Sequence, residues 1–233
     1  MPCPRCGAAH VPAQRFCAEC GAPLGEPPGP RGSSAPASYT PRHLAEKILT
    51  SKAALEGERK QVTVLFCDIA GSTALAERLG ADAMHRLLNR FFDVALAEVH
   101  RYEGTINQFL GDGFMALFGA PVAHEDHARR AALAALGIQR AVHERQTELA
   151  GEAGVLAVRM GMNTGPVVVG RIGDNLRMDY TAIGDTTNLA PRLETLAAPG
   201  TILMSEATHR LVRGFFHVRA TGNGLHLVLG GQV

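Results

Sequence analysis

The sequence predicts a mixed α/β domain that is preceded by a small cysteine-rich module. Two observations predict the domain: apolar runs rich in β-branched residues alternate, from about residue 59, with stretches that carry apolar residues at helical spacing. The module is predicted by the cysteines, because four of the five lie in the first 20 residues. With 233 residues, 46% of them hydrophobic and 19% charged, the chain has the composition of a globular protein.

Composition excludes several classes of function. Lys and Arg together number 23, Asp and Glu 22, and this balance argues against a surface that coats nucleic acid or a membrane. The longest apolar run, near residues 131–138, is far shorter than the ~20 residues of a membrane helix. The N-terminus also lacks the apolar region of a secretory signal. We therefore expect a cytoplasmic protein that contacts neither a membrane nor nucleic acid.

The N-terminal cysteines form two CxxC pairs, and these predict a structural zinc site. The pairs are Cys3 with Cys6 and Cys17 with Cys20. Four thiolates can bind one Zn²⁺ tetrahedrally and leave no open position for a substrate. The alternative, two disulfides, needs an oxidising compartment. We expect a short Cys₄ zinc ribbon over residues 1–24 that offers a contact for a protein partner.

The rest of the chain divides by composition. Residues 25–41 are rich in Pro, Gly and Ser and predict an extended linker, and residues 42–58 predict a helix that leads into the main domain. We expect the main domain over residues 59–218 and an atypical tail over residues 219–233.

The main domain alternates strands with helices. Ser72 or Thr73 is expected to cap the first helix, and Gly104 to stop the second. The Thr164-Gly165-Pro166 segment is expected to form a turn between two strands. The expected elements are a strand at 61–68, a helix including 85–100, a hairpin of 104–110 and 113–119, a helix at 124–146, strands at 156–162 and 167–171, a helix at 186–196 and a strand at 201–205.

Two aspartates are the candidate chemical groups. Asp68 ends the first strand, and Asp112 lies at the tip of the hairpin. If that strand lies beside the hairpin, the two carboxylates meet at one sheet edge and suit Mg²⁺ or Mn²⁺. The residues that follow, Gly71, Ser72 and Thr73, open a helix whose N–H groups suit a phosphate. The alternative is structural: Asp68 caps a helix and Asp112 serves a turn.

Four stretches carry a family resemblance: VTVLFCDIAGST, INQFLGDGFMALFG, VRMGMNTGPVVVGRIG and DYTAIGDTTNLAPRLE. Through them, residues 59–218 resemble a class III adenylyl/guanylyl cyclase catalytic domain. The resemblance implies an α+β fold with a ferredoxin-like, palm-type sheet flanked by helices. It implies two Mg²⁺ or Mn²⁺ per active site, held by Asp68, Asp112 and the Ile69 carbonyl. It also implies a transition-state pair, Asn188 and Arg192, and a homodimer whose composite sites take metal ligands from one protomer and this pair from the other.

Three departures from the family pattern affect what the resemblance implies. The adenine-selecting Lys falls on Gln108 and its partner on Thr181, which loosens purine selection, because an amide both donates and accepts. Pro191 precedes Arg192 inside the predicted helix, where it costs up to ~3 kcal/mol. The tail does not resemble the family's terminal strand pair, and ribbon-bearing cyclase domains resemble the front of longer chains, so a truncated or frame-shifted relative is one interpretation.

Two functions follow from these residues. The first is a cyclase that converts ATP into cyclic AMP and pyrophosphate by two-metal in-line attack, for cyclic-nucleotide signalling; GTP is the second candidate substrate. The second is a catalytically degenerate, nucleotide-binding regulatory domain whose ribbon contacts a partner. We expect the enzyme, because Asp68, Asp112, Asn188 and Arg192 are all present.

Overall fold

The computed structural model describes residues 41–43, 46–47, 59–151, 154–172, 178–182 and 186–231. The four N-terminal cysteines lie outside these ranges, and so does the predicted linker over residues 25–41 except for its last residue. Within them the elements are β1 (Arg59–Ile69), α2 (Ser72–Leu79), α3 (Ala81–Arg101), β2 (Thr105–Leu110), β3 (Gly113–Phe118), α4 (His127–Glu144), α5 (Gln146–Ala150), β4 (Val158–Ile172), β5 (Met178–Ala182), α6 (Thr186–Leu196), β6 (Ile202–Ser205), α7 (Glu206–Val212), β7 (Phe216–Gly222) and β8 (Leu225–Gly231).

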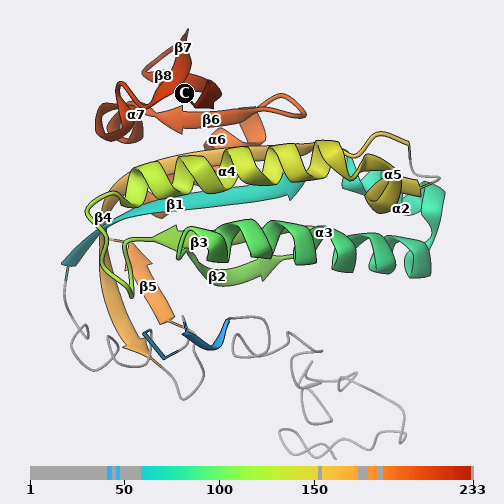
Figure 1. Cartoon of the computed structure of the whole chain (residues 1–233), viewed down its shortest axis with the longest axis horizontal. Helices are drawn as coiled ribbons and strands as arrows, with labels where there is room; N and C mark the ends of the chain where they lie inside the picture. The colour runs from blue at the N-terminus through green and yellow to red at the C-terminus, as the bar shows by residue number, and fades with distance from the viewer. Residues whose placement is uncertain are drawn as a thin grey trace, which may run out of the picture. The chain divides into compact units, whose positions relative to one another are not determined.

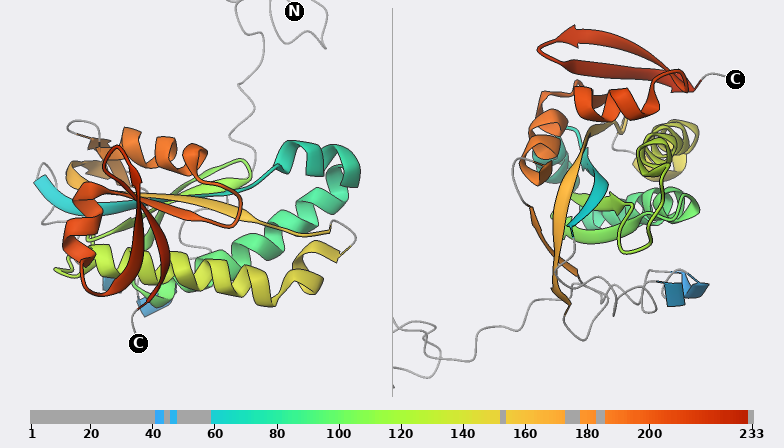
Figure 2. Two further views of the ribbon diagram at one scale, coloured as in Figure 1. Left: turned by 90° about the horizontal axis from the view of Figure 1, so that it is seen from above. Right: turned by 90° about the vertical axis from the view of Figure 1, so that its left-hand side faces the viewer.

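The strands form one sheet with helices on both faces, which confirms the mixed α+β prediction. Seven strands follow the order β2-β3-β1-β4-β6-β8-β7, and β5 pairs with β4 off this path (Figure 1). Most described pairings are antiparallel, but β4 and β6 run parallel. Helices α3 and α4 cover one face and α6 lies on the other (Figure 2). No helix in the described part of the chain has the length and hydropathy needed to cross a bilayer.

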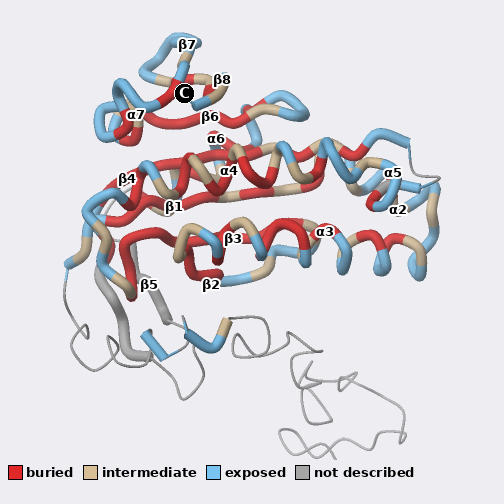
Figure 3. Tube along the Cα trace, in the orientation of Figure 1, coloured by how far each residue is buried: buried red, intermediate tan, exposed pale blue. Residues whose placement is uncertain are grey.

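Strand β1 lies between β3 and β4 in the sheet and is buried on both of its faces. Leu65 and Ile69 are buried beneath α3 and α4, whereas Val62 and Val64 belong to the core on the side of α6. A strand that is buried on both faces shows a continuous apolar run instead of a clean alternation of apolar and polar residues. Figure 3 shows the buried path along β1 and the inner sides of the two long helices. This burial fixes the position of the polar residue that interrupts the run, Asp68.

The predicted helices of this face are confirmed. In α3, Ala95 and Val99 are buried, and Leu88 and Phe92 pack against the same core while partly exposed. The alanine-rich prediction over residues 124–146 corresponds to α4, which begins at His127. Small side chains along α4 let it lie close to the sheet, so the two long helices form one layer (Figure 2).

The predicted turn at residues 164–166 is wrong. Strand β4 runs without interruption from Val158 to Ile172 and pairs with β1 along the whole length of β1. On its other edge, β6 pairs with residues 160–162 and β5 with residues 167–172. The interval between these two pairings accommodates Pro166, which has no N–H to donate to a neighbouring strand. The carbonyl of Pro166 accepts a hydrogen bond from Thr186 Oγ1 of α6 at 3.1 Å.

The C-terminal segment forms a hairpin that continues the sheet. Strands β7 and β8 pair with one another, and β8 pairs antiparallel with β6. His226 and Val228 are buried on β8. The hairpin therefore crosses the predicted domain boundary at residue 218 as one structural unit with β6 and α7.

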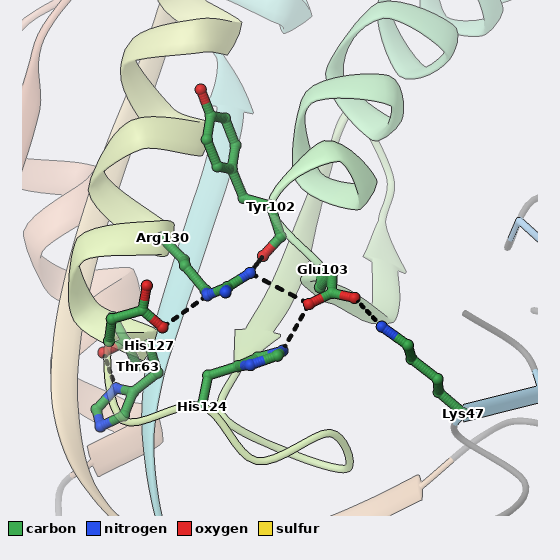
Figure 4. A network of polar contacts seen from close by, with 8 residues as sticks. Lys47, Thr63, Tyr102, Glu103, His124, His127 and Arg130 are labelled. Atoms are coloured by element: carbon green, nitrogen blue, oxygen red, sulfur yellow. Dashed lines mark hydrogen bonds and ion pairs between the residues drawn. The ribbon is translucent and has the colours of Figure 1, made fainter. Parts of the chain in front are cut away.

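A polar network joins the segment before the domain to the α3–β2 turn (Figure 4). The described residues of the predicted 42–58 helix, Arg42–His43 and Glu46–Lys47, are helical. The Lys47 ammonium pairs with the Glu103 carboxylate, which also lies 3.1 Å from His124 Nε2 and 3.2 Å from Arg130 Nη1. The hydrogen bond from Lys47, supported by the other cations, lowers the pKa of Glu103. Ionised Glu103 thus connects three parts of the chain.

Helix α6 sits directly on β4 because β4 presents a glycine beneath it. A Cβ on Gly161 would lie 2.2 Å from the Ala190 carbonyl oxygen and 2.3 Å from the Glu194 nitrogen. These are backbone atoms, so a larger residue would have to push the helix away from the sheet. Pro191 lies inside α6, as predicted, and the helix continues through it to Leu196.

We expect Gly161→Ala to displace α6 and to lower the free energy of unfolding by about 1–3 kcal/mol through overpacking. Denaturant unfolding monitored by circular dichroism measures this. Gly230→Ala is the matched control, because a Cβ on that strand glycine meets no atom within 4 Å. If Gly161→Ala is as stable as the control, the close seat of α6 is refuted.

Candidate functional site

Asp68 and Asp112 meet at one sheet edge, as expected. Asp68 lies opposite Gly113 in the β1–β3 register, and Asp112 is the preceding residue, in the β2–β3 turn. A Cβ on Gly113 would lie 2.5 Å from the Cys67 carbonyl oxygen and 3.0 Å from Asp68 Oδ1. A residue without a side chain is therefore needed at 113 for the turn to approach Asp68 this closely.

A basic residue and a further acidic residue join this pair. Arg159 lies opposite Asp68 in the β1–β4 register and donates a hydrogen bond from Nη2 to Asp68 Oδ2 at 2.9 Å. Arg159 Nε lies 3.2 Å from Glu194 Oε1 of α6, but neither atom makes a hydrogen bond with any described residue. The contact is an ion pair with misaligned donors, and both atoms keep capacity for another polar partner.

The electrostatics of the cluster disfavour its charged form. Burial raises the pKa of Asp68, a hydrogen bond from Arg159 opposes the shift, and the neighbouring Asp112 raises the pKa further. Burial also raises the pKa of Glu194, although Arg159 opposes this shift as well. Three carboxyl groups therefore surround a single guanidinium at this edge.

This donor set fits a divalent cation. Carboxylate and carbonyl oxygens are hard ligands that suit Mg²⁺ or Mn²⁺. Asp68 and Asp112 are close enough to share a hydrogen bond, and Ile69 ends β1 directly after Asp68. A cation between the carboxylates would remove the repulsion that raises the pKa of Asp68. Asp68, Asp112 and the Ile69 carbonyl are therefore the residues that would hold it.

The start of α2 differs from the expectation for its cap. Gly71 is the N-cap residue, with φ of 70°, and no side chain accepts a hydrogen bond there. The prediction that Ser72 or Thr73 caps this helix is wrong, because both lie inside the first turn of α2. A glycine cap has no side-chain oxygen that could compete for the first N–H groups, so the cap leaves them accessible to a phosphate.

Asn188 and Arg192 lie on the exposed side of α6. Ala190, Leu193 and Glu194 of the same helix are buried against the sheet, whereas Asn188 and Arg192 are exposed. Both line an open hollow together with Pro191, Thr195 and Leu196. Their spacing of four residues puts them on one helix face, as predicted. That face points away from the side on which Glu194 meets Arg159.

A buried hydrogen-bond network fixes the beginning of α6. Asn163 Nδ2 donates to the Thr186 carbonyl at 2.9 Å, and Asn163 Oδ1 accepts from Ser205 Oγ at 2.7 Å. The network continues through hydroxyl groups on four elements and ends at a buried imidazole; its further members are Thr208, Thr164, Thr63 and His127. Because buried polar groups are costly when unpaired, this network holds the first turn of α6 in one position.

The two candidate purine-binding residues lie on different strands. Gln108 is exposed on β2, next to a register shift between Ile106 and Gln108. Thr181 lies on β5, opposite Val168 of β4. These positions do not test the predicted role of the two residues in purine selection, which stays a prediction.

Sequence reasoning missed Arg159 and Glu194. A signal for each was present: Arg159 is the one charged residue among the positions that alternate with apolar residues over 156–162, and Glu194 lies on the apolar side of a helix, between Leu193 and Ala197. A charged residue at a buried position implies a charged partner. The partner is set by the β1–β4 register and by the packing of α6, neither of which periodicity reveals.

Comparison with known sequences establishes the family. The sequence profile of the adenylate and guanylate cyclase catalytic domain matches residues 56–229. The chain therefore belongs to this family of nucleotidyl cyclases. It is 35% identical over 161 residues to adenylate cyclase 1 of Rhizobium meliloti, a match that covers 68% of this chain and 24% of that protein. The chain spans about a quarter to a third of the length of the curated relatives that it matches.

Solved structures of the family share the fold. The adenylyl cyclase CyaB from P. aeruginosa superposes with a TM-score of 0.69 and 34% identity, covering 76% of this chain and 98% of that one. A dimeric guanylyl cyclase domain from the fungus Blastocladiella emersonii gives a TM-score of 0.68 and 29% identity, covering 77% and 99%. Adenylyl and guanylyl cyclases are thus both among the structural neighbours.

We expect Asp68→Asn to unfold, without divalent cations at pH 7, at the same temperature as the wild-type chain or a higher one. The fold raises the pKa of Asp68. Its stabilising contribution is therefore present below the unfolded pKa and is lost as pH rises through the folded pKa. Any difference between the two proteins should disappear below about pH 4.

Thermal unfolding with and without Mg²⁺ or Mn²⁺ completes this test. Saturating cation should raise the wild-type unfolding temperature by several degrees and leave Asp68→Asn unchanged. The exposed Asp93→Asn of α3 is the control and should respond as the wild type does. An undiminished cation response in Asp68→Asn would show that Asp68 does not bind the ion.

Proposed function

We propose that this chain is a nucleotidyl cyclase that converts ATP into cyclic AMP and pyrophosphate, in cyclic-nucleotide signalling. The observation that carries the proposal is the Asp68–Asp112 carboxyl pair at the end of β1, where three carboxyl groups surround a single guanidinium. A structural capping role for Asp68 does not account for it, because its carboxylate pairs with Arg159 and Gly71 caps α2.

The reaction forms one bond and breaks another at the α-phosphorus. The ribose 3′-oxygen attacks this atom and loses its proton, and the bond to the oxygen that bridges to the β-phosphate breaks. When bound, two Mg²⁺ or Mn²⁺ ions lower the pKa of the 3′-hydroxyl and neutralise phosphate charge. Asp68, Asp112 and Ile69 bind the nucleotide through these ions, and the start of α2 at Gly71, Ser72 and Thr73 donates N–H groups to phosphate oxygens.

Three further side chains complete the proposed site, two of them positively charged. Arg192 neutralises charge that develops on the phosphates, and Asn188 orients the ribose. The Arg159 guanidinium, which donates from Nη2 to Asp68 Oδ2, would be released from Asp68 when a cation takes that carboxylate. Its guanidinium then faces the same region as the nucleotide phosphates. Such fixed charges stabilise a transition state without reorganising water.

We propose a homodimer with composite sites. The exposed face of α6 that carries Asn188 and Arg192 points away from the side that reaches Arg159 and Asp68. One chain therefore presents the two halves of the site in different directions. A second copy, related by a two-fold axis, would place the Asn188/Arg192 half against the carboxylates of its partner.

We favour ATP over GTP as the substrate, because the residue pair typical of guanylyl cyclases is absent. Gln108 and Thr181, at the positions of the family's adenine-selecting pair, loosen this preference, because an amide both donates and accepts. The alternative is a degenerate regulatory domain that binds a nucleotide without turnover. Pro191 favours the regulatory alternative, because a proline inside α6 removes one backbone hydrogen bond beside Arg192.

The proposal also includes a cytoplasmic location and a zinc ribbon at the N-terminus. The thiolates of such a ribbon persist in a reducing compartment. The ribbon would contact a protein partner.

The purified chain should form cyclic AMP from ATP in the presence of Mg²⁺ or Mn²⁺, with less or no cyclic GTP from GTP. Asp68→Ala should lower turnover by about 10²-fold or more, because the charge of the phosphates is then poorly neutralised. Chromatographic separation of the products measures both. A folded, dimeric chain that yields no product with any of these combinations would favour the regulatory alternative.

Mixing two inactive variants tests the composite site. Asp68→Ala and Arg192→Ala should each be inactive alone. In an equal mixture half of the dimers are mixed and each has one intact site, so about one quarter of the wild-type activity should return. Mass spectrometry of the intact dimers checks that mixed species form. Mixed dimers without recovered activity would contradict a site shared between protomers.

A further inference from the structure

A second cluster of metal-ligating side chains lies away from the carboxylate edge. Glu206 and His209 are on α7, and His226 is on β8. Glu206 Oε2 lies 2.6 Å from His226 Nε2 and 3.8 Å from His209 Nδ1. One ligand atom from each of the three residues lies within 4.8 Å of the others. None of these residues takes part in the proposed cyclase reaction.

The cluster is partly shielded, and one carboxylate oxygen already faces the two imidazoles. The His226 side chain is 11% exposed and that of His209 is 19% exposed, and their rings stack with centroids 3.9 Å apart. Arg210 Nε donates to Glu206 Oε1 at 3.0 Å, so the other oxygen, Oε2, faces the imidazoles. Such an outer partner fixes the orientation of a ligating carboxylate.

We propose that Glu206, His209 and His226 form a binding site for a transition-metal ion, with Zn²⁺ as the best match. Two imidazoles and one carboxylate provide three protein ligands and leave a fourth position for water, as in known zinc sites. This site goes beyond the proposed cyclase function and does not depend on it.

The charges around the cluster favour a transition ion over Mg²⁺ or Ca²⁺. The site has one carboxylate, that of Glu206, and it pairs with Arg210. The positive charge of Arg213 acts on His209. The site therefore has no excess of negative charge. Affinity must therefore come from the imidazole nitrogens, which suit zinc.

Binding requires a modest rearrangement. Ligand bonds of 2.0–2.2 Å in a tetrahedral site put the ligand atoms roughly 3.3 Å apart. The 2.6 Å contact must open and the 3.8 Å contact must close by about half an ångström or more. One imidazole must also turn about its Cβ–Cγ bond, because stacked rings do not both point at one ion. The hydrogen bond between Glu206 and His226 is then exchanged for two bonds to the ion.

Zinc bound at this site would act on the C-terminal β7–β8 hairpin. His226 is on β8, which pairs with β6 and β7, whereas Glu206 and His209 are on α7. Bound zinc would cross-link the hairpin to α7. An ion that binds only the folded chain raises its stability by mass action.

The test measures zinc in the full-length chain with saturating Mg²⁺, so that the carboxylate edge is occupied. His209→Gln and His226→Gln should each bind one zinc fewer per chain than the wild type. His217→Gln is the matched control, because His217 is exposed on β7 and outside the cluster. The four N-terminal cysteines are unchanged in every variant, so zinc bound by them cancels in the comparison.

Unfolding temperature gives the second readout. At a 100-fold excess over Kd, zinc should raise the unfolding temperature of the wild type and of His217→Gln by roughly 5–10 °C. This zinc-dependent part should be absent in both cluster variants. A merely structural role for the histidines lowers the temperature equally with and without zinc. Equal zinc content and an equal zinc response in all four proteins would overturn the proposal.

The wild-type chain alone provides a test that does not depend on the variants folding. Crystals grown with Zn²⁺ should show an anomalous-scattering peak within bonding distance of His209 Nδ1, His226 Nε2 and Glu206 Oε2. Data collected on both sides of the zinc absorption edge identify the element. Crystals that show no peak at this position under saturating zinc would refute the site.

Discussion

The ion pair between Asp68 and Arg159 is the contact on which the arrangement of the site depends. It joins the end of β1 to β4 at a single register position, and through Glu194 it reaches α6. Its charges do not balance, because Asp112 adds a third carboxylate and burial raises the pKa of Asp68. The fold thus brings acidic groups together at partly buried positions, and perturbed pKa values of this kind are typical of functional sites.

The position of α6 is fixed by contacts that differ in kind. Gly161 lets the helix backbone approach β4, and Asn163 holds the first turn through its bond to the Thr186 carbonyl. These contacts hold α6 by its buried side and at its first turn. None of them uses the backbone N–H that Pro191 lacks. The helix can therefore tolerate a proline while it presents Asn188 and Arg192 to the outside. The proposed homodimer would use this outward face, since a site divided between two protomers needs one half exposed.

The C-terminal region is a separate physical unit within the same sheet. The β7–β8 hairpin extends the sheet beyond β6, and its buried His226 stacks on His209 of α7. Its polar cluster shares no side chain with the carboxylate edge. Under the two proposals, the carboxylate edge and this cluster would bind different ions in different parts of one domain.

The sequence by itself determined the element types and one half of the site. The spacing of apolar residues and the turn residues predicted β1, α3, the β2–β3 hairpin and α6. Asp68 and Asp112 were candidates because they lie at a strand end and in a turn. Periodicity could not show that β4 runs through Pro166, because a free edge opposite that proline exists only once β5 and β6 are paired. Nor could it show which partners Arg159 and Glu194 meet, or that His209 stacks on His226. Those contacts join residues far apart in the chain, and only strand register and helix packing decide which of them meet.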